Sequence, residues 1–567
     1  MPVEIKKTLV LTLLCVLIIP SALGSIQGKE NQSFVAPPPF LINKSFINNI
    51  TATKVAQNMI YNNGKTREGY DLDKMETVYG ENNLVLGYLF SMKPQGYIMV
   101  SAHKNLPPII AYSFDNDAPR GTEGLNPLQQ LLKMDIQLRL ENIHNLSPEI
   151  MEKRRILWHE LVWKKTPAIF LNNFQQWPPQ GTTSTGGWLE TNWHQETPFN
   201  DFCPIDMTTR EKSIAGCPAV AMAQILNYHG NLGTIYFNDS DDYPHNYGGN
   251  RYIIDDDHVE FGFPSFPELN RYLDTLRSLY QLNITLTDGD KAALIFACGV
   301  AAHQVYSSEV SGTYGVNQAY QAYRRFGLTE NQLLNNQDPE LFGRLRMNMV
   351  NGLPAHLAVV IPDWSGGHNL VVDGYNTDDY YHLNFGWGGS WNGWYLLPQE
   401  LPYDLTMIEG VIVDIMDKHE GSEIYCQGFL SWGNIEPGEM INGSFTIENR
   451  GNTGSIVDWR IVEWPEWGTW TFSSLAGGPL TPDNKPARVN FSIVSPEKKN
   501  RDFTGYIKVV NTNDADDYFI LPVSMALPLK LNDSVFPILQ ILHKLVTICI
   551  SWTLISVSYT HLTLPTN

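Results

Sequence analysis

Residues 215–230 read Ala-Gly-Cys-Pro-Ala-Val-Ala-Met-Ala-Gln-Ile-Leu-Asn-Tyr-His-Gly. Pro218 suits the first turn of a helix, because the N–H that proline lacks would have no partner there. The residues that follow favour a helix, and Gly230 is typical of its end. The segment therefore predicts a helix that begins beside Cys217, where free N–H groups and the helix dipole stabilise a thiolate. A cysteine buried in a core helix fits this segment equally well.

A single histidine far downstream is the candidate partner of this cysteine. His368 follows Gly366-Gly367, opens a strand-like run and lies about 150 residues after Cys217, a separation close to that of papain-type enzymes. The glycines allow a sharp turn that leaves the ring unshielded. An imidazole beside a thiolate can donate and accept the proton that nucleophilic catalysis moves.

Three more residues complete the candidate site. Asn384 lies on the next strand-like run, joined to the first by a predicted short hairpin, and its amide oxygen could orient the imidazole. Trp387 could cover that hydrogen bond, although ordinary core packing explains it as well. Gln195 precedes the cysteine, and its side-chain amide could join the Cys217 backbone N–H as an oxyanion hole.

Length and composition restrict the class of protein. The chain has 567 residues, which predicts several domains, and 43% hydrophobic against 17% charged residues, which is globular. The net charge of −20 disfavours binding to nucleic acid or to anionic membranes. The six cysteines include no CxxC pair, which argues against a zinc site or a disulfide scaffold.

The N-terminus predicts export. A charged start, the apolar run 9–19 and small residues before position 25 have the pattern of a secretory signal peptide, assigned to residues 1–24. An uncleaved membrane anchor is the alternative. We expect the protein to be secreted or on the cell surface.

The rest of the chain divides into four parts. Residues 25–165 mix helical and strand-like runs without a nucleophile paired to a base. Residues 166–417 have a helical half followed by a strand half, which predicts an α+β fold. Residues 418–528 carry short, evenly spaced strand patterns typical of an immunoglobulin-like β-sandwich. Residues 529–567 are a tail that could be an anchor or an artefact of translated cloning sequence.

Together the motifs resemble the streptopain family of papain-like cysteine peptidases, over roughly residues 185–415. The resemblance implies Cys217 as nucleophile and His368 as acid and base. It implies Gln195 as oxyanion donor, with Asn384 and Trp387 orienting and shielding the histidine. The matching segments are residues 193–195, 216–229, 367–374 and 381–389. Phe385 departs from the pattern, because the family often has a second tryptophan there.

The resemblance also implies a secreted endopeptidase made as a zymogen. Residues 25–165 would be a pro-domain that inhibits the enzyme intramolecularly and is removed by a cut between about Glu149 and Gly187. The partners would be protein or peptide substrates, with a bulky apolar residue just upstream of the cleaved residue. No metal or organic cofactor is implied.

Two other functions stay open at this point. One is a catalytically inactive adhesin or carbohydrate-binding surface protein on a protease fold. The other is a different thiol acyl-transfer enzyme, such as a transglutaminase or a cell-wall amidase, which uses the same pair of groups.

Overall fold

The computed structural model describes most of the chain between residues 45 and 527. The described ranges are 45–80, 83–118, 127–163, 174–360, 367–398, 408–416, 421–428, 430–433, 435–497 and 502–527. The expected signal peptide (1–24) and the C-terminal tail (529–567) lie outside the described residues. Within the described part, no helix is both long and apolar enough to cross a membrane.

Residues 49–163 form an antiparallel meander accompanied by helices. Strands β2, β3 and β4 consist almost wholly of buried side chains, which is why they read as apolar runs. The region thus contains both the helical and the strand-like runs that the sequence indicates. The elements are α3 (Asn49–Asn62), β1 (Asp71–Tyr79), β2 (Val85–Lys93), β3 (Tyr97–Ser101), β4 (Ile109–Ser113), α4 (Pro127–Glu141) and α5 (Pro148–Trp163).

The next part is mainly helical and packs around α6 (Cys217–His229). Gly230 ends α6 in the left-handed conformation at φ 62°, as its position after the helical run predicts. Thr287 and Asp290 form a capping box at the start of α9. The other elements are β6 (Tyr243–Tyr247), β7 (Asn250–Ile254), α7 (His258–Phe261), α8 (Phe266–Gln281), α9 (Asp288–Ala301), α10 (Val316–Arg325) and α11 (Leu341–Val350).

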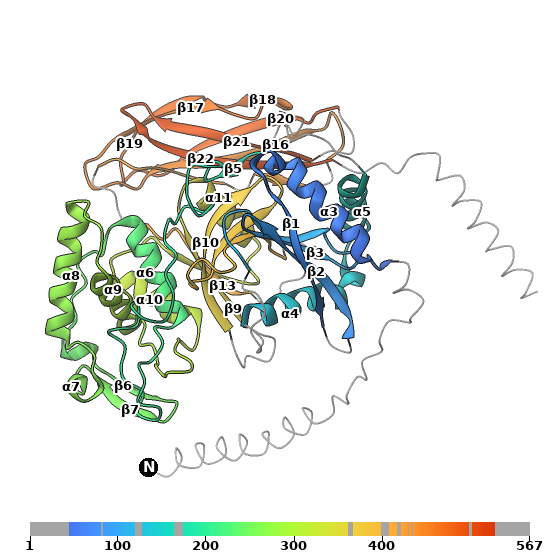
Figure 1. Ribbon diagram of the computed structural model, residues 1–567. Coiled ribbons are helices and arrows are strands. Elements are labelled where there is room, and N and C mark those ends of the chain that lie inside the picture. Colours follow the sequence, from blue (N-terminus) through green and yellow to red (C-terminus); the bar gives the residue numbers. More distant parts are fainter. Residues whose placement is uncertain are drawn as a thin grey trace, which may run out of the picture. The chain divides into compact units, whose positions relative to one another are not determined.

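One large sheet carries the strands that follow. Its order is β1-β2-β3-β4-β12-β11-β10-β9-β13-β8, with β5 paired to β10, and Figure 1 follows it from the blue strands to the yellow ones. The expected hairpin joins β10 to β11. The remaining strands are β5 (Gln176–Trp177), β8 (Gln332–Asn335), β9 (Ala355–Val360), β10 (Gly367–Asn376), β11 (Tyr380–Asn384), β12 (Gly393–Leu396) and β13 (Ile408–Val413).

The two faces of β10 contribute to different cores. Val371 lies in the core around α6, whereas Leu370 and Val372 lie in the core that the sheet shares with β2 and β3. This split follows from the two-residue period of a strand. Successive residues of β10 therefore face different surroundings.

The N-terminal meander is not a separate sheet. Strand β4 pairs with β12 through Tyr112 opposite Trp394 and Ala111 opposite Tyr395. Residues 25–165 and 166–417, which the sequence predicts as two domains, contribute strands to one sheet. Periodicity within a run does not reveal which distant strand will be its neighbour.

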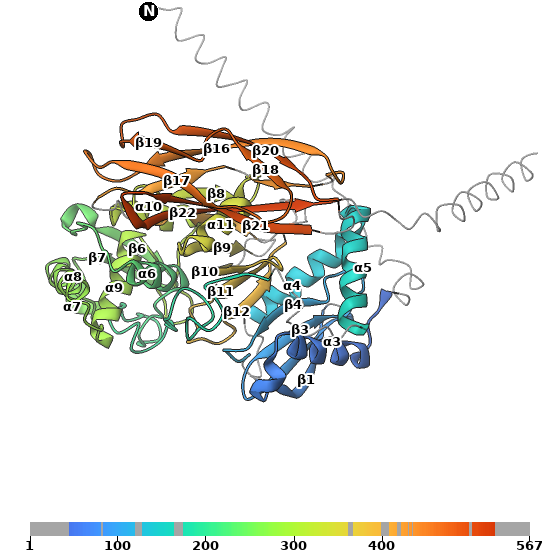
Figure 2. The ribbon, with the colours of Figure 1, turned by 90° about the horizontal axis from the view of Figure 1, so that it is seen from above.

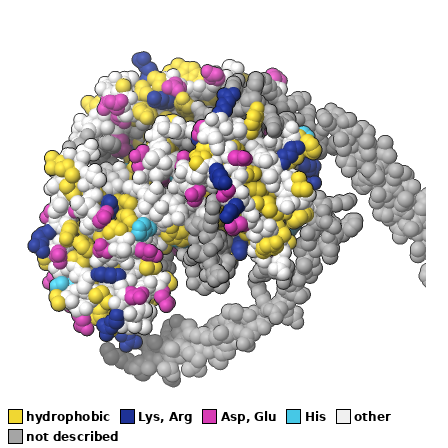
Figure 3. All heavy atoms as spheres, in the orientation of Figure 1, with side chains coloured by type: hydrophobic (Ala, Val, Ile, Leu, Met, Phe, Trp, Pro, Cys, Tyr) yellow, Lys and Arg dark blue, Asp and Glu magenta, His cyan; other side chains and the backbone are white. Residues whose placement is uncertain are grey.

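Residues 424–526 form two further sheets around one apolar core, seen in orange in Figure 2. The sheet orders are β14-β16-β20-β18 and β15-β22-β21-β17-β19. The strands are β14 (Ile424–Gln427), β15 (Ser431–Trp432), β16 (Met440–Asn449), β17 (Val457–Glu463), β18 (Thr469–Phe472), β19 (Ala476–Leu480), β20 (Ala487–Val494), β21 (Asp502–Asn511) and β22 (Asp514–Ala526). On the face drawn in Figure 3, acidic and basic side chains are interspersed.

Candidate active site

Cys217 is the first residue of α6, and a glycine corner places it there. Gly216 has φ 83°, and a Cβ on it would lie 2.7 Å from the Gln304 side chain. The Gln304 amide in turn donates to the Ala215 carbonyl at 2.8 Å. A residue with a side chain would be strained at this position and would meet Gln304, so the local geometry favours glycine at position 216.

The Cys217 thiol is half-buried and accepts a hydrogen bond from β10. The donor is the backbone N–H of Asn369, 3.4 Å from Sγ. Burial raises the pKa of the Cys217 thiol, and hydrogen bonds from the Asn369 backbone, the Asn369 side chain and the cysteine's own N–H oppose that rise. The helix N-terminus favours the thiolate as well.

His368 lies near the start of β10 but is turned toward the strand that follows. Its Nε2 is 2.9 Å from the Phe385 carbonyl oxygen, so Nε2 carries a proton and donates. The ring also lies 4.6 Å from Trp387, at 37° to it. Burial lowers the pKa of His368 to about 4, so the imidazole is neutral near pH 7. This bond uses Nε2 and leaves Nδ1 available, and the hydrogen bonds of the described residues include none between His368 and the Cys217 thiol.

Asn384 ends β11 and also has partners other than the predicted one. Its Oδ1 accepts from the Gly386 N–H at 3.1 Å and from the Gln224 amide at 3.3 Å. Its Nδ2 donates to the Thr191 carbonyl at 2.8 Å. Asn384 thus ties β11 to α6 and to the loop at 191, and the expected bond to His368 is not among its contacts.

Gln195 lies beside the cysteine corner through its backbone. Its carbonyl accepts from the Ala215 N–H at 2.8 Å. Gln224, fully buried on α6, holds the start of the same loop, because its Oε1 accepts from the Thr191 hydroxyl at 2.9 Å and from the Trp193 N–H at 3.3 Å. The sequence pattern did not single out Gln224. A lone polar residue in an otherwise apolar helix is the signal that could have found it.

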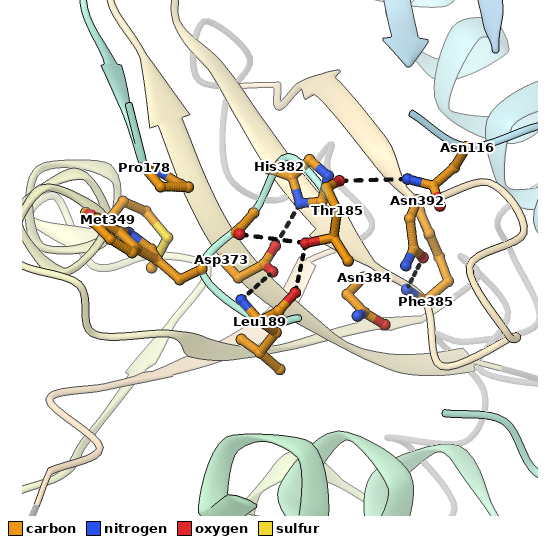
Figure 4. A network of polar contacts seen from close by, with 12 residues as sticks. Asn116, Pro178, Thr185, Leu189, Met349, Asp373, His382, Asn384, Phe385 and Asn392 are labelled. Carbon is orange, nitrogen blue, oxygen red and sulfur yellow. Dashed lines mark hydrogen bonds and ion pairs between the residues drawn. The ribbon is translucent and has the colours of Figure 1, made fainter. Parts of the chain in front are cut away.

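A second polar network fixes the chain that leads into this loop (Figure 4). Asp373 on β10 and His382 on β11 form a fully buried pair, with 2.6 Å between Oδ1 and Nδ1. The other Asp373 oxygen accepts from the Leu189 N–H at 3.1 Å. A Cβ on Gly187 would lie 2.2 Å from Asp373, so the backbone passes close to the carboxylate. The motif residue Asp373 therefore positions the chain at Gly187 and Leu189, which leads into the loop that carries Gln195.

The structure also points to residues that sequence reasoning missed. Asn369 contacts the thiol and His356 contacts Asn369, yet each is one polar residue in a strand-like run. In the described part of the chain, no group of three His, Cys, Asp or Glu side chains could hold a metal ion.

Comparison with known families now identifies the class. Residues 193–395 match the Peptidase C10 family, and residues 44–137 match the Spi protease inhibitor. The match of the central region confirms the resemblance to the streptopain-like cysteine peptidases, and every predicted site residue falls within it. The inhibitor match covers α3 and β1 to β4.

Individual relatives are distant. The chain is 22% identical over 339 residues to the thiol protease/hemagglutinin PrtT of Porphyromonas gingivalis, covering 56% of this chain. The chain spans about a third (35%) of the length of that curated relative. Among solved structures, a prointerpain A fragment of Prevotella intermedia is 20% identical, covers 61% of this chain and 99% of its own, and has a TM-score of 0.41. Active interpain A from the same organism is 23% identical, covers 41% and 94%, and has a TM-score of 0.31.

Proposed function

We propose that this chain is a secreted cysteine endopeptidase made as a zymogen. The observation that carries the proposal is the position of Cys217, half-buried at the N-terminus of α6 with a backbone N–H on its sulfur, inside a region that matches a peptidase family. Residues 25–165 would be the pro-domain, 166–417 the papain-like catalytic domain and 418–528 an immunoglobulin-like sandwich.

The proposed reaction proceeds through an acyl-enzyme. The Cys217 thiolate attacks the carbonyl carbon of a peptide bond, and the oxyanion is held by the Cys217 backbone N–H and the Gln195 side-chain amide. Imidazolium His368 donates its proton to the leaving amine as the C–N bond breaks. Water, deprotonated by His368, then attacks the thioester and releases the acid and the thiolate. Asn384 and Trp387 would orient and shield the imidazole.

This mechanism needs a nitrogen of His368 beside the Cys217 sulfur, and Nδ1 can take that place while Nε2 stays bonded to Phe385. In the structure the ring donates to the Phe385 carbonyl, and its burial keeps it neutral. We infer that the chain, with its inhibitor-like residues in place, is a latent form in which the pair has not assembled. Approach of the imidazole to Sγ would then be part of activation.

The test is self-processing of the full-length chain under reducing conditions. In the wild type we expect stepwise loss of the N-terminal part by mass, together with cleavage of casein. Cys217→Ser should abolish both, while Cys203→Ala, which changes another free and buried cysteine, should retain them. An unchanged wild-type mass without casein cleavage would refute the proposal.

A catalytically inactive binding protein on the same fold is the second candidate. It is favoured by one observation, that among the described residues His368 is hydrogen-bonded to Phe385 and not to the Cys217 thiol. The same assay separates the two, because an inactive protein would show no processing in any variant.

A further inference from the structure

Asn369 on β10 faces the Cys217 sulfur. Its backbone N–H donates to Sγ at 3.4 Å, and its side-chain amide also favours the thiolate. Position 369 shares a face of β10 with Val371, which packs in the core around α6. His368 shares the opposite face with Leu370. The regular part of the strand therefore presents residue 369, not residue 368, to the helix that carries the cysteine.

A buried histidine fixes the orientation of the Asn369 amide. His356 on β9 is fully buried, and its Nε2 lies 2.7 Å from Asn369 Oδ1. The strand register places His356 opposite Val371, so it is the diagonal neighbour of Asn369 on the same face. Because an amide oxygen only accepts, His356 Nε2 must carry the proton. With the oxygen held by His356, the NH2 end of the amide is left for the sulfur.

Tyr323 completes this chain of hydrogen bonds. Its hydroxyl lies 3.1 Å from His356 Nδ1, and both residues are completely buried. Since Nε2 carries the ring proton, Nδ1 accepts from the tyrosine hydroxyl. Burial lowers the pKa of His356 to about 4, so the ring stays neutral and this single tautomer persists near pH 7. Each polar atom of the imidazole has one partner, and the direction of every bond is determined.

We propose that Asn369 is a further residue of the active site, which stabilises the Cys217 thiolate through its amide donors, and that His356 and Tyr323 are positioning residues that hold it. A role of this arrangement in catalysis rests on the proposed function, whereas its effect on the pKa of the Cys217 thiol does not. While His368 is bound to Phe385, Asn369 is the β10 residue that contacts the sulfur.

Hydrogen bonds to a charged acceptor are stronger than those between neutral groups. Removing the side-chain donor should therefore raise the thiol pKa by about one unit, which lowers the thiolate fraction about tenfold on the acid side of the profile. This change is measurable in the uncut chain, before any peptidase activity.

The experiment follows alkylation of Cys217 by iodoacetamide in the full chain from about pH 5 to about pH 10, quantified on the Cys217 peptide by mass spectrometry. Asn369→Leu keeps the size and removes the donor, and should slow alkylation about tenfold below the thiol pKa. Asn270→Leu is the matched control, because Asn270 is a buried asparagine whose hydrogen bonds go to Phe237. Its profile should equal that of the wild type.

The positioning residues give graded outcomes. His356→Leu and Tyr323→Phe should shift the profile in the same direction by smaller amounts, roughly threefold and twofold in rate. His356→Gln keeps an N–H donor and should restore the wild-type profile.

An unchanged profile in folded Asn369→Leu overturns the proposal. If that variant does not fold, Asn369→Ala removes the same donor with a smaller side chain, and an unchanged profile there is equally decisive. A shifted profile in a chain that never cleaves peptides would refute the proposed function and leave this inference standing.

Discussion

Two regions flank the residues that match the peptidase family, and they are attached to them in different ways. On the N-terminal side, β4 continues the central sheet through β12, and the buried Tyr97 hydroxyl lies 2.7 Å from both the Trp391 carbonyl and the Tyr395 hydroxyl. On the C-terminal side the contact is made by side chains. The Asn351 amide donates to the Ile520 carbonyl and accepts from its N–H, each at 2.8 Å.

The difference shows which region depends on the centre for its fold. A shared backbone ladder with a buried tyrosine is part of one core, so the inhibitor-like residues and the central sheet should unfold together. Residues 424–526 have a core between two sheets to which α11 contributes Met347, and a few side-chain bonds add to this contact. Such a contact is typical of two domains that are each stable alone.

A fall in pH should produce the largest difference in stability between the central region and residues 424–526. Burial lowers the pKa of His245, His356 and His368 to about 4, and residues 421–527 contain no histidine. The unfolded chain protonates these imidazoles near pH 6.5, so it binds more protons than the folded chain as the pH falls from about 6.5 to 4. Stability is therefore lost across this window, by on the order of 3 kcal/mol for each histidine at pH 4.

Hydrogen exchange followed by mass spectrometry at pH 7 and near pH 4 is the measurement. Peptides from α6, β9 and β10 should lose protection in acid, while those from β16 and β20 should keep it. Equal loss in both regions would contradict the comparison.

Truncation of the buried tyrosine should have the next largest effect. Tyr97→Ala leaves a cavity against Trp391 and removes one of the two partners of the Tyr395 hydroxyl, and should lower the free energy of unfolding by about 3–5 kcal/mol. Urea unfolding of the full chain measures it. Tyr97→Phe keeps the packing and removes the hydroxyl, so its loss should be about 1 kcal/mol. If the alanine variant were no less stable than the phenylalanine variant, the shared core would be in doubt.

The smallest effect is expected at the other junction. Asn351→Ala leaves the Ile520 N–H and carbonyl without their side-chain partners, which should cost about 1–2 kcal/mol because the site is only half-buried. The Ile520 amide should exchange faster, while exchange in β20 should not change. A drop in stability as large as that of Tyr97→Ala would mean that this junction too is part of a common core.

Local features of the fold were predictable from the sequence. The start of α6 at Cys217 and its end at Gly230 depend on proline and glycine within that segment, and the β10–β11 hairpin depends on alternation on either side of a turn. The pairing of Ala111 with Tyr395 was not predictable, because a single sequence contains no signal for which strands meet across almost 300 residues.

The candidate site was predictable in its residues more than in its contacts. The roles of Cys217, Gln195 and Asn384 stay a prediction, while Gln224 on α6 binds both Asn384 and the loop that carries Gln195. The orientation of His368 was not predictable, because it depends on a hydrogen bond from Nε2 to the Phe385 carbonyl, a backbone group that any residue provides. Asn369 was not identified from the sequence, because the motif is defined by the neighbouring His368.

The two-pair ladder between β4 and β12 has a consequence for a processed molecule. If the N-terminal strands left after cleavage, β12 would become the outermost strand, with open N–H and carbonyl groups beside Trp394 and the aromatic ring of Tyr395. An open edge strand of this kind can pair with an extended peptide, including β12 of another copy of the chain. Removal of the N-terminal strands would thus give a product inclined to self-associate as its concentration rises.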